Sequence, residues 1–386
     1  MTEELLKQHL TLALVSGLGP KLTKALLEWF GTPVAVLNAS VAQLEAVPQV
    51  GNVLAEKFAK GIKNAKLDVE WTLLRQHGVQ VFVNGHDGYP PRLTTLENAP
   101  HLLYCKGEML PTDEKSIGIV GSRSCTSYGK RMTQLLAEGL ARMGWTVVSG
   151  LARGIDGVAH QSALEAGGRT IAVLANGLST VYPPEHKELA QAVAARGAVI
   201  TETPMTVAPQ AGMFPARNRI ISGLSRAVVV VEANARSGAL ITATHAAEQG
   251  REVFAFPGNA DSAASAGCLE LIRKGVRLIR NLDDLLEDLQ GISTPQPPPP
   301  KRSKAKPMAQ RTMMEEEIEE QAAMPMPEMT ADQQVVWSVL SEPKHVDELI
   351  RELNKTSGEL TRLLMAMELK RLVRRMPGNQ YERRVG

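Results

Sequence analysis

The stretch SIGIVGSRSCTSYGKRMTQLLAEGLARMGWTVVSGL, residues 116–151, decides the fold class. It begins with the apolar run SIGIVGS, continues through the amphipathic segment YGKRMTQLLAEGLARMG and ends in a second apolar run, TVVSGL. Runs that are apolar almost throughout are typical of strands covered on both faces. A strand, a helix and a second strand in this order predict a βαβ unit with parallel strands.

The same alternation continues through residues 71–290. Further apolar runs follow in the order TIAVLANGL, AVITET, AVVVVEA, EVFAFPG and VRLI, with helical segments such as HKELAQAVAARG between them. This series predicts an α/β fold with a doubly wound, mainly parallel sheet. Right-handed crossovers place every strand-to-helix loop on one edge of such a sheet, and ligands of open α/β sheets bind at that edge.

The bulk composition sets limits on the class of protein. A chain of 386 residues is long enough for two or three domains, and a net charge of +2 does not by itself indicate a polyanion partner. Cys105, Cys125 and Cys268 are scattered, which is typical of reduced thiols in a cytoplasmic protein. The start MTEELLKQHL lacks a signal-peptide pattern, and no apolar run approaches the roughly 20 residues of a membrane span. We therefore expect a cytoplasmic protein without a membrane segment.

Composition also divides the chain into four parts. Residues 291–329 contain STPQPPPPKRSKAKP and MMEEEIEEQ, a Pro-rich and charged composition that predicts a disordered linker. The linker's basic half could touch nucleic acid, although a solvated tether is the favoured interpretation. The linker separates the α/β region at 71–290 from a C-terminal domain at 330–386, and residues 1–70 form a separate helical domain.

The two ends resemble known small modules. SGLGPKLTKALLEWFGT, with its Gly17-Leu18-Gly19 turn, resembles a helix-hairpin-helix, and residues 44–58 resemble a second copy with Gln49 where glycine is expected. Residues 1–70 hold seven basic and seven acidic side chains, so accessory DNA contact and packing alone both stay open. Residues 330–386 predict three helices and a hairpin, which resembles a winged helix that binds duplex DNA or a protein. Its expected wing is crowded by Arg371, Arg374, Arg375, Arg383 and Arg384.

The loops at the predicted edge carry residues suited to a chain of phosphates. Glycine allows close backbone approach, hydroxyls and helix-start amides donate to phosphate oxygens, and arginine binds phosphate with two parallel hydrogen bonds. Cations outnumber acids there: Arg123, Arg153, Lys187, Arg217, Arg219 and Arg236 stand against Asp156, Glu202, Glu232 and Asp261. The edge therefore predicts an anion site spread over several loops.

The segment FPARNRIISGLS, residues 214–225, supplies two of these cations. We expect Arg217 and Arg219 in the first turn of a helix, where cations oppose the helix dipole and a bound anion would relieve the conflict. Bland alternatives exist for other edge residues. Asp156 could cap the helix near Gly157, and Glu232 could pair with a neighbouring arginine.

Several enzyme and cofactor classes lack their motifs. GIVGSRSCTSYG does not have the GxGxxG spacing of a dinucleotide turn, and neither GxxxxGK[ST] nor GxSxG occurs. The eight histidines do not cluster at metal-ligand spacing. We expect no cofactor, no metal and no catalytic activity.

Five motifs in order resemble the DprA family, also called Smf, the DNA-processing proteins of bacterial transformation. They are GSRxxxxYG at 121–129, SGLARGID at 149–156, NGLxxxYPPEH, FPARNRIISGLS and SGALITA…GREVFAFPG, over about 200 residues. The resemblance implies an extended Rossmann-like domain that binds single-stranded DNA. It also implies a homodimer that loads the recombinase RecA, protects the strand from nucleases and displaces single-strand-binding protein.

The resemblance and the edge chemistry together give the expected DNA-binding residues. They are Ser122, Arg123, Ser149, Gly150, Arg153, Gly154, Asn176, Lys187, Phe214, Arg217, Asn218, Arg219, Ser237 and Gly238. Phe214 could stack on a base or pack under its loop. At one position the chain departs from the family pattern, since Leu269 stands where the family usually has Asn.

A second hypothesis is an enzyme. The fold and the GSR start also resemble lysine-decarboxylase-like phosphoribohydrolases, which cleave the base from a nucleotide with a glutamate in a PGGxGTxxE motif. The corresponding region here reads VEANARSGALITA, so the motif is missing. Glu232 would be the candidate acid of this alternative.

Overall fold

The computed structural model describes residues 1–290 and, in the C-terminal part, 329–340, 344–353, 355–356, 360, 363–364, 367, 372–376 and 380–383. The chain divides into two compact units, 1–298 and 299–386. The predicted linker at 291–329 lies almost entirely outside the described residues. Among the described residues, no helix is both long and apolar enough to cross a bilayer.

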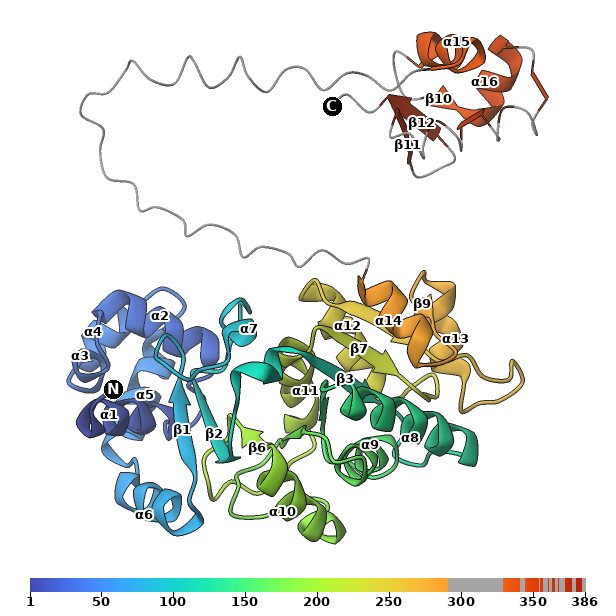
Figure 1. Cartoon of the computed structure of the whole chain (residues 1–386). Coiled ribbons are helices and arrows are strands. Elements are labelled where there is room, and N and C mark those ends of the chain that lie inside the picture. Colours follow the sequence, from blue (N-terminus) through green and yellow to red (C-terminus); the bar gives the residue numbers. More distant parts are fainter. Residues whose placement is uncertain are drawn as a thin grey trace. The chain divides into compact units, whose positions relative to one another are not determined.

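The chain begins with a group of six helices, drawn in blue in Figure 1. They are α1 (Glu3–Ala13), α2 (Pro20–Phe30), α3 (Pro33–Leu37), α4 (Val41–Glu45), α5 (Asn52–Lys63) and α6 (Leu67–His77). Gly17 precedes α2 with a φ of 87°, and Gln49 precedes α5 with a φ of 73°. Gln49 thus adopts the left-handed conformation that normally requires glycine, as the predicted second helix-hairpin-helix copy requires.

One sheet forms the centre of the first unit, and the prediction of a mainly parallel, doubly wound sheet is confirmed. Its order is β1-β2-β6-β5-β4-β3-β7-β8-β9. β1 pairs antiparallel with β2, and β2 pairs antiparallel with β6. Every other pair of neighbouring strands in this sheet is parallel. The strands are β1 (Gln80–Val83), β2 (Leu102–Gly107), β3 (Ser116–Val120), β4 (Thr146–Ser149), β5 (Thr170–Val173), β6 (Ala198–Thr201), β7 (Ala227–Val230), β8 (Glu252–Ala255) and β9 (Arg277–Leu278).

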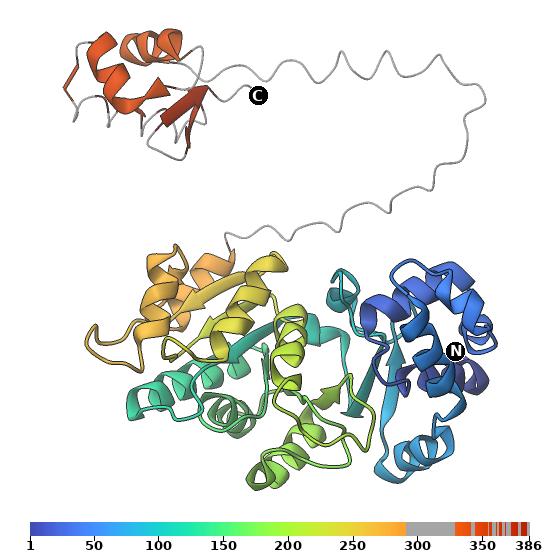
Figure 2. The same ribbon diagram turned by 180° about the vertical axis from the view of Figure 1, so that it is seen from behind.

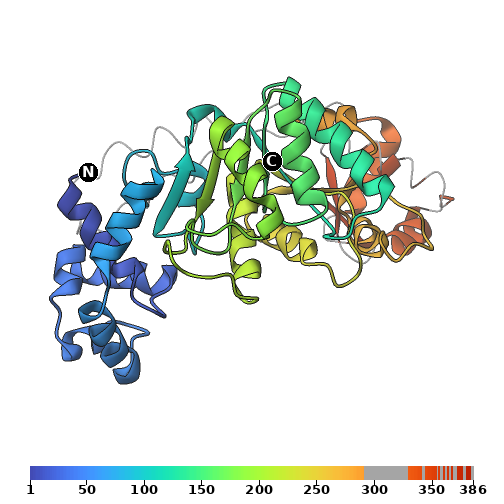
Figure 3. The same cartoon turned by 90° about the horizontal axis from the view of Figure 1, so that it is seen from below.

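Helices cover both faces of this sheet, as Figures 2 and 3 show. One face packs against α7 (Pro91–Thr94), α11 (Met213–Leu224), α12 (Ala239–Glu248) and α13 (Ala266–Arg273). The other packs against α8 (Ser127–Arg142), α9 (Ile155–Glu165), α10 (Lys187–Arg196) and α14 (Leu282–Gln290). Two short 3-10 helices, η1 (Pro111–Glu114) and η2 (Pro184–His186), lie in connecting segments. Strands buried on both faces explain why their sequences are apolar almost throughout.

The strand order reverses beside β3. Strands β4, β5 and β6 follow on one side of β3, whereas β7, β8 and β9 follow on the other. The loops that leave β3 and β7 therefore run toward opposite faces, and a crevice opens between them at the carboxyl ends of the strands. This is the place in the fold where a ligand site is expected.

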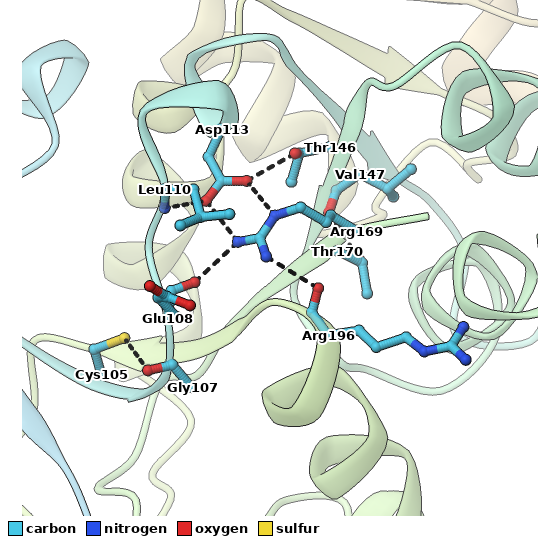
Figure 4. Close-up of polar contacts among 10 residues, drawn as sticks. All are labelled: Cys105, Gly107, Glu108, Leu110, Asp113, Thr146, Val147, Arg169, Thr170 and Arg196. Carbon is cyan, nitrogen blue, oxygen red and sulfur yellow. Dashed lines mark hydrogen bonds and ion pairs between the residues drawn. The ribbon is translucent and has the colours of Figure 1, made fainter. Parts of the chain in front are cut away.

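An ion pair between the partly buried Arg169 and the buried Asp113 fastens the opposite edge of the sheet (Figure 4). The Asp113 carboxylate accepts hydrogen bonds from Arg169 Nε at 3.0 Å and from the Thr146 hydroxyl at 2.8 Å. The same guanidinium donates to the carbonyl oxygens of Glu108 at 2.9 Å and Arg196 at 3.3 Å. The end of β2, the starts of β4 and β5 and the end of α10 are thereby held together.

The first helices share a core with the sheet. Leu10 of α1 lies in one apolar cluster with Leu74 of α6 and Tyr104 of β2. The expected boundary between residues 70 and 71 falls inside α6. The division of residues 1–290 into two domains at that position therefore stays a prediction.

The second unit has the elements of a winged helix, as predicted. Helices α15 (Ala331–Val339) and α16 (Val346–Leu353) accompany a sheet of order β10-β12-β11, with strands Lys344–His345, Gln380–Arg383 and Val373–Met376. The expected third helix and the side chains of Arg371, Arg374, Arg375 and Arg384 lie largely or wholly outside the described residues. Arg383 packs over the Trp337 ring and donates to the Trp337 carbonyl oxygen at 2.8 Å.

A histidine pair joins α1 to the segment before β2. His9 Nδ1 lies 3.0 Å from His101 Nε2, and the His86 ring centroid lies 5.7 Å from that of His9. Burial, reinforced by the neighbouring histidines, lowers the pKa of His9 to about 4 and that of His101 to about 3. Both rings are therefore neutral in the folded protein at neutral pH.

We expect the free energy of unfolding to fall between about pH 7 and pH 5, because both histidines bind protons when the chain unfolds but not when it is folded. The stability that they contribute is complete above the unfolded pKa of 6.5 and is lost below it. At pH 5 the loss is about 2 kcal/mol for each histidine. Urea unfolding at both pH values should show that His101→Gln loses about 2 kcal/mol less than the wild type. His245→Gln, at the end of α12, is the control, and equal losses in all three proteins would contradict the prediction.

Candidate functional site

A cavity of 690 Å³ opens at the crevice between the loops after β3 and β7. We call it the rim cavity. Its polar and aromatic lining residues are Ser122, Arg123, Ser124, Asp156, Tyr182, Phe214, Arg217, Asn218, Asn234, Ser237 and Thr242, with Gly121, Gly238 and several apolar residues between them. Seven of the fourteen residues predicted from the sequence line it: Ser122, Arg123, Phe214, Arg217, Asn218, Ser237 and Gly238.

A cation and two aromatic rings form one wall of the rim cavity. The exposed Arg123 guanidinium lies 5.2 Å from the centroid of the Phe214 ring, and Phe214 lies 5.7 Å from the Tyr182 ring, tilted by 57°. Phe214 and Tyr182 are only partly buried, so their rings are accessible from the cavity. A phosphate and a neighbouring base could contact such a wall together, because guanidinium binds phosphate and aromatic rings stack on bases.

Backbone contacts hold the Ser122 loop in place. Ser122 N–H donates to the Glu232 carbonyl oxygen at 2.7 Å, and the Ser122 carbonyl accepts from Ile155 N–H at 3.1 Å. Gly154 sits against this loop at a φ of 71°, where an added Cβ would lie 2.2 Å from the Ser122 carbonyl oxygen. Gly154 is therefore required for the loops after β3 and β4 to meet, and it does not line the cavity.

Arg217 is buried below the rim cavity, and its expected place in the first turn of α11 was wrong. The helix begins at Met213, which puts Arg217 in the second turn. Its guanidinium donates to the carbonyl oxygens of Gly150, at 2.6 Å, and Val173, at the ends of β4 and β5. No bound anion is needed to explain this cation, since backbone carbonyl oxygens already compensate it.

Asp156 accompanies Arg217 as the buried acid of this region. Its carboxylate accepts hydrogen bonds from Gly150 N–H at 3.1 Å and Ala152 N–H at 3.4 Å. Burial raises the pKa of Asp156, opposed by Arg217, and burial lowers the pKa of Arg217 to about 10, opposed by Asp156. Asp156 thus orders the turn after β4. This role goes beyond the helix cap that the sequence offered as an alternative.

Two other predicted cations are neutralised by acids. Arg219 is 5% exposed, forms an ion pair with Glu202 at 2.6 Å and does not line the rim cavity. Its predicted position in the first helical turn was likewise wrong, because it is the seventh residue of α11. Arg153 is exposed but forms an ion pair with Glu185.

The remaining predicted residues hold loops or lie elsewhere. The Ser149 hydroxyl donates to the Ile119 carbonyl oxygen at 2.6 Å, and the Asn176 amide donates to the Thr180 carbonyl oxygen at 2.8 Å. Gly150 gives room to Arg217, whose guanidinium carbon would lie 2.6 Å from an added Cβ. Lys187 is exposed at the start of α10 and lines a second cavity instead.

Asn234 and Thr242 line the rim cavity but were not among the fourteen residues predicted to bind DNA, although the sequence places Thr242 at the same edge. Asn234 is exposed and its side-chain oxygen accepts from Arg236 N–H at 2.9 Å. Thr242 is buried in the first turn of α12. The signal for both residues was their place in the segment EANARSGALIT, which follows the β7 run.

Glu232, the candidate acid of the enzyme hypothesis, has a structural role. It is 3% exposed, and its carboxylate accepts from Thr126 N–H at 2.9 Å, at the start of α8. A Cβ on Gly129 would lie 2.0 Å from Glu232 Oε2, so the carboxylate fills space against α8. It does not line the rim cavity, and among the residues that the structure describes no arginine forms an ion pair with it.

Family models match three parts of the chain. The model described as DNA recombination-mediator protein A matches residues 80–290, which is more than half of the chain. A DprA winged-helix model matches residues 320–379, and a model of a SAM-like helix-hairpin-helix tandem matches residues 10–64. The last match agrees with the two turns at Gly17 and Gln49.

Curated relatives and solved structures carry the same family names. The chain is 34% identical to protein Smf from Synechocystis over 96% of both chains. It is 43% identical to DNA processing protein DprA of Bacillus subtilis over 56% of this chain and 73% of the relative. DprA from Streptococcus pneumoniae matches with a TM-score of 0.65 and 34% identity, covering 73% of this chain and 97% of that one. DNA processing protein A from Helicobacter pylori, whose structure concerns its single-stranded DNA binding mode, matches with a TM-score of 0.50 and 29% identity over 55% and 96% of the two chains.

Gly154→Ala should destabilise the protein far more than Gly144→Ala. Both glycines have a φ of 71°, but a Cβ at Gly144 meets nothing within 4 Å, whereas one at Gly154 meets the Ser122 carbonyl oxygen. We expect a loss of about 1 kcal/mol for Gly144→Ala from backbone strain alone and about 3 kcal/mol or more for Gly154→Ala. Urea unfolding at neutral pH measures both losses. Similar losses would show that the loops after β3 and β4 separate easily.

Proposed function

Because the chain belongs to the DNA recombination-mediator protein A family, we propose that it binds single-stranded DNA in the rim cavity and loads a RecA recombinase onto that strand. The family establishes a DNA-processing, recombination-mediator role. The finer steps are proposals: protection of incoming strands during natural transformation, displacement of single-strand-binding protein, and action as a cytoplasmic homodimer. The single-stranded DNA bound by the Helicobacter pylori relative supports the choice of ligand.

One observation carries the proposal, namely the wall made by Arg123, Phe214 and Tyr182. Arg123 is exposed, and no described carboxylate forms an ion pair with it, so its guanidinium is available for a phosphate. Phe214 and Tyr182 offer stacking surfaces that suit any base, which favours binding without sequence preference. A flexible single strand can present phosphate and base to one wall together, whereas a stacked duplex keeps its bases inside.

The cations at the edge limit how strongly binding depends on salt. Within the described part of the chain, Arg123, Lys187 and Arg236 are the exposed cations of these loops that lack an acidic partner. Three neutralised phosphates give a slope of log affinity against log salt of about −2, shallower than the roughly −3 expected for four contacts. Arg217 and Arg219 add little to this slope because both are already compensated.

We propose a non-catalytic protein. The competing enzyme hypothesis requires a carboxylate at the ligand, but the Glu232 carboxylate caps α8 outside the rim cavity. The carboxylate that does line the cavity, Asp156, is buried and accepts two backbone N–H groups. The hydrogen bonds that both acids accept from backbone N–H groups favour a structural role for them over a catalytic one.

Arg123→Ala should weaken binding of unrelated single strands about equally, by roughly tenfold, and reduce the salt slope by about 0.7. The free energy of unfolding should stay the same because Arg123 is exposed. Fluorescence anisotropy with labelled oligonucleotides of two different sequences at several salt concentrations measures both quantities. Arg142→Ala is the control, since Arg142 is an exposed residue of α8 that pairs with Glu138. If the Arg123→Ala variant bound single-stranded DNA as tightly as the wild type, the rim cavity would not be the binding site.

A further inference from the structure

A second cavity lies on the flank of the sheet. It has a volume of 520 Å³, and we call it the flank cavity. Its walls come from the loop after β5, the start of α10 and the strands β2 and β6. The lining residues are His77, Lys106, Leu174, Leu178, Ser179, Thr180, Val181, Pro184, Lys187, Ala190, Gln191 and Val199. The cavity is large enough for a nucleotide, since ligand sites commonly measure about 300–1,000 Å³.

The rim cavity and the flank cavity share one wall, the loop from Val181 to Pro184. Tyr182 lines the rim cavity, whereas Val181 and Pro184 line the flank cavity. Neighbouring Cα atoms such as those of Val181 and Tyr182 are only about 3.8 Å apart. The two cavities therefore lie on either side of one short loop.

The flank cavity combines an apolar floor with cations. Leu174, Leu178 and Val199 belong to a buried apolar cluster, which gives the cavity a surface on which a flat ring can pack. Lys106 and Lys187 stand at its border, and neither forms an ion pair with a described residue. No carboxylate lines the cavity, and the nearby Glu185 is engaged by Arg153. An apolar ring joined to a negative charge matches this lining.

A buried hydroxyl supplies the polar group that such a ring needs. Ser179 Oγ is inaccessible to solvent and has no hydrogen-bond partner, although Ser179 N–H is held by the Met205 carbonyl oxygen at 3.2 Å. A buried hydroxyl without a partner is costly unless a ligand completes it. The edge of a nucleobase carries both donors and acceptors, and it would reach this hydroxyl only if the loop after β5 moved enough to expose Ser179 Oγ to the cavity.

We propose that the flank cavity binds a second nucleotide of the strand held in the rim cavity. Its base packs on the apolar floor near Ser179, and its phosphate lies between Lys187 and Lys106. This inference rests on the proposed function, because it assigns a further subsite to the same single strand. It also gives Lys187, which does not reach the rim cavity, a place on the path of the DNA.

The test measures affinity against strand length. Labelled oligothymidylates of about 3 to about 10 nucleotides are titrated into the wild type by fluorescence anisotropy. We expect affinity to rise by at least about fivefold at the length that first reaches the flank cavity, the gain from one stacked base. Ala190→Phe fills the cavity, and Lys106→Ala removes a border cation. Both variants should bind the shortest strands like the wild type and lose the rise with length.

Two controls keep the outcomes distinct. Lys274→Ala removes a cation of the α13 end that already pairs with Glu270, and it should keep the full rise with length. Lys106→Ala tests the idea even if the Ala190→Phe chain fails to fold. If the wild type binds no strand of any length, the proposed function itself is wrong. If the wild type binds short strands but both variants show the same rise with length, only the second subsite is wrong.

Discussion

The guanidinium of Arg217 is the contact on which the ligand edge of the sheet depends. It joins α11 to the carbonyl oxygens at the ends of β4 and β5, while Asp156 orders the turn after β4 beside it. A buried cation with these partners cannot be removed without leaving carbonyl groups and a carboxylate uncompensated. The floor of the rim cavity is thus a rigid polar layer, and the loops above it are positioned by that layer.

The residues of the sequence motifs around the rim cavity are of two kinds: those that hold the loops in place and those whose side chains are exposed. Gly150 leaves room for the guanidinium, and Gly154 lets the loop after β4 touch the loop after β3. Because these close contacts are made by glycines and backbone groups, the side chains that remain at the surface are few. Arg123 and Phe214 are the clearest of them. A motif of small and charged residues therefore builds a platform, and half of the fourteen predicted residues do not line the rim cavity.

Much of the architecture could be predicted from the sequence, because it follows from periodicity. Apolar runs separated by amphipathic segments specify the parallel sheet, and the carboxyl edge then collects every strand-to-helix loop. The second helix-hairpin-helix copy at Gln49 was also recognisable, because residues 44–58 resemble the first copy. What could not be predicted was whether each arginine side chain is exposed or buried, and which groups it contacts. Arg123, Arg217 and Arg219 look alike in the sequence, yet one is exposed, one is bound by carbonyl oxygens and one pairs with Glu202. That choice depends on partners far away in the chain and on where α11 begins.

The ion pair between Arg153 and Glu185 has a consequence for any anion that approaches this edge. A phosphate that binds Arg153 must first displace the Glu185 carboxylate. Breaking that ion pair reduces the binding free energy that the new contact contributes. The carboxylate returns as soon as the phosphate leaves. If this edge binds the strand proposed above, such an exchange favours binding that is readily reversed over binding that is as tight as possible.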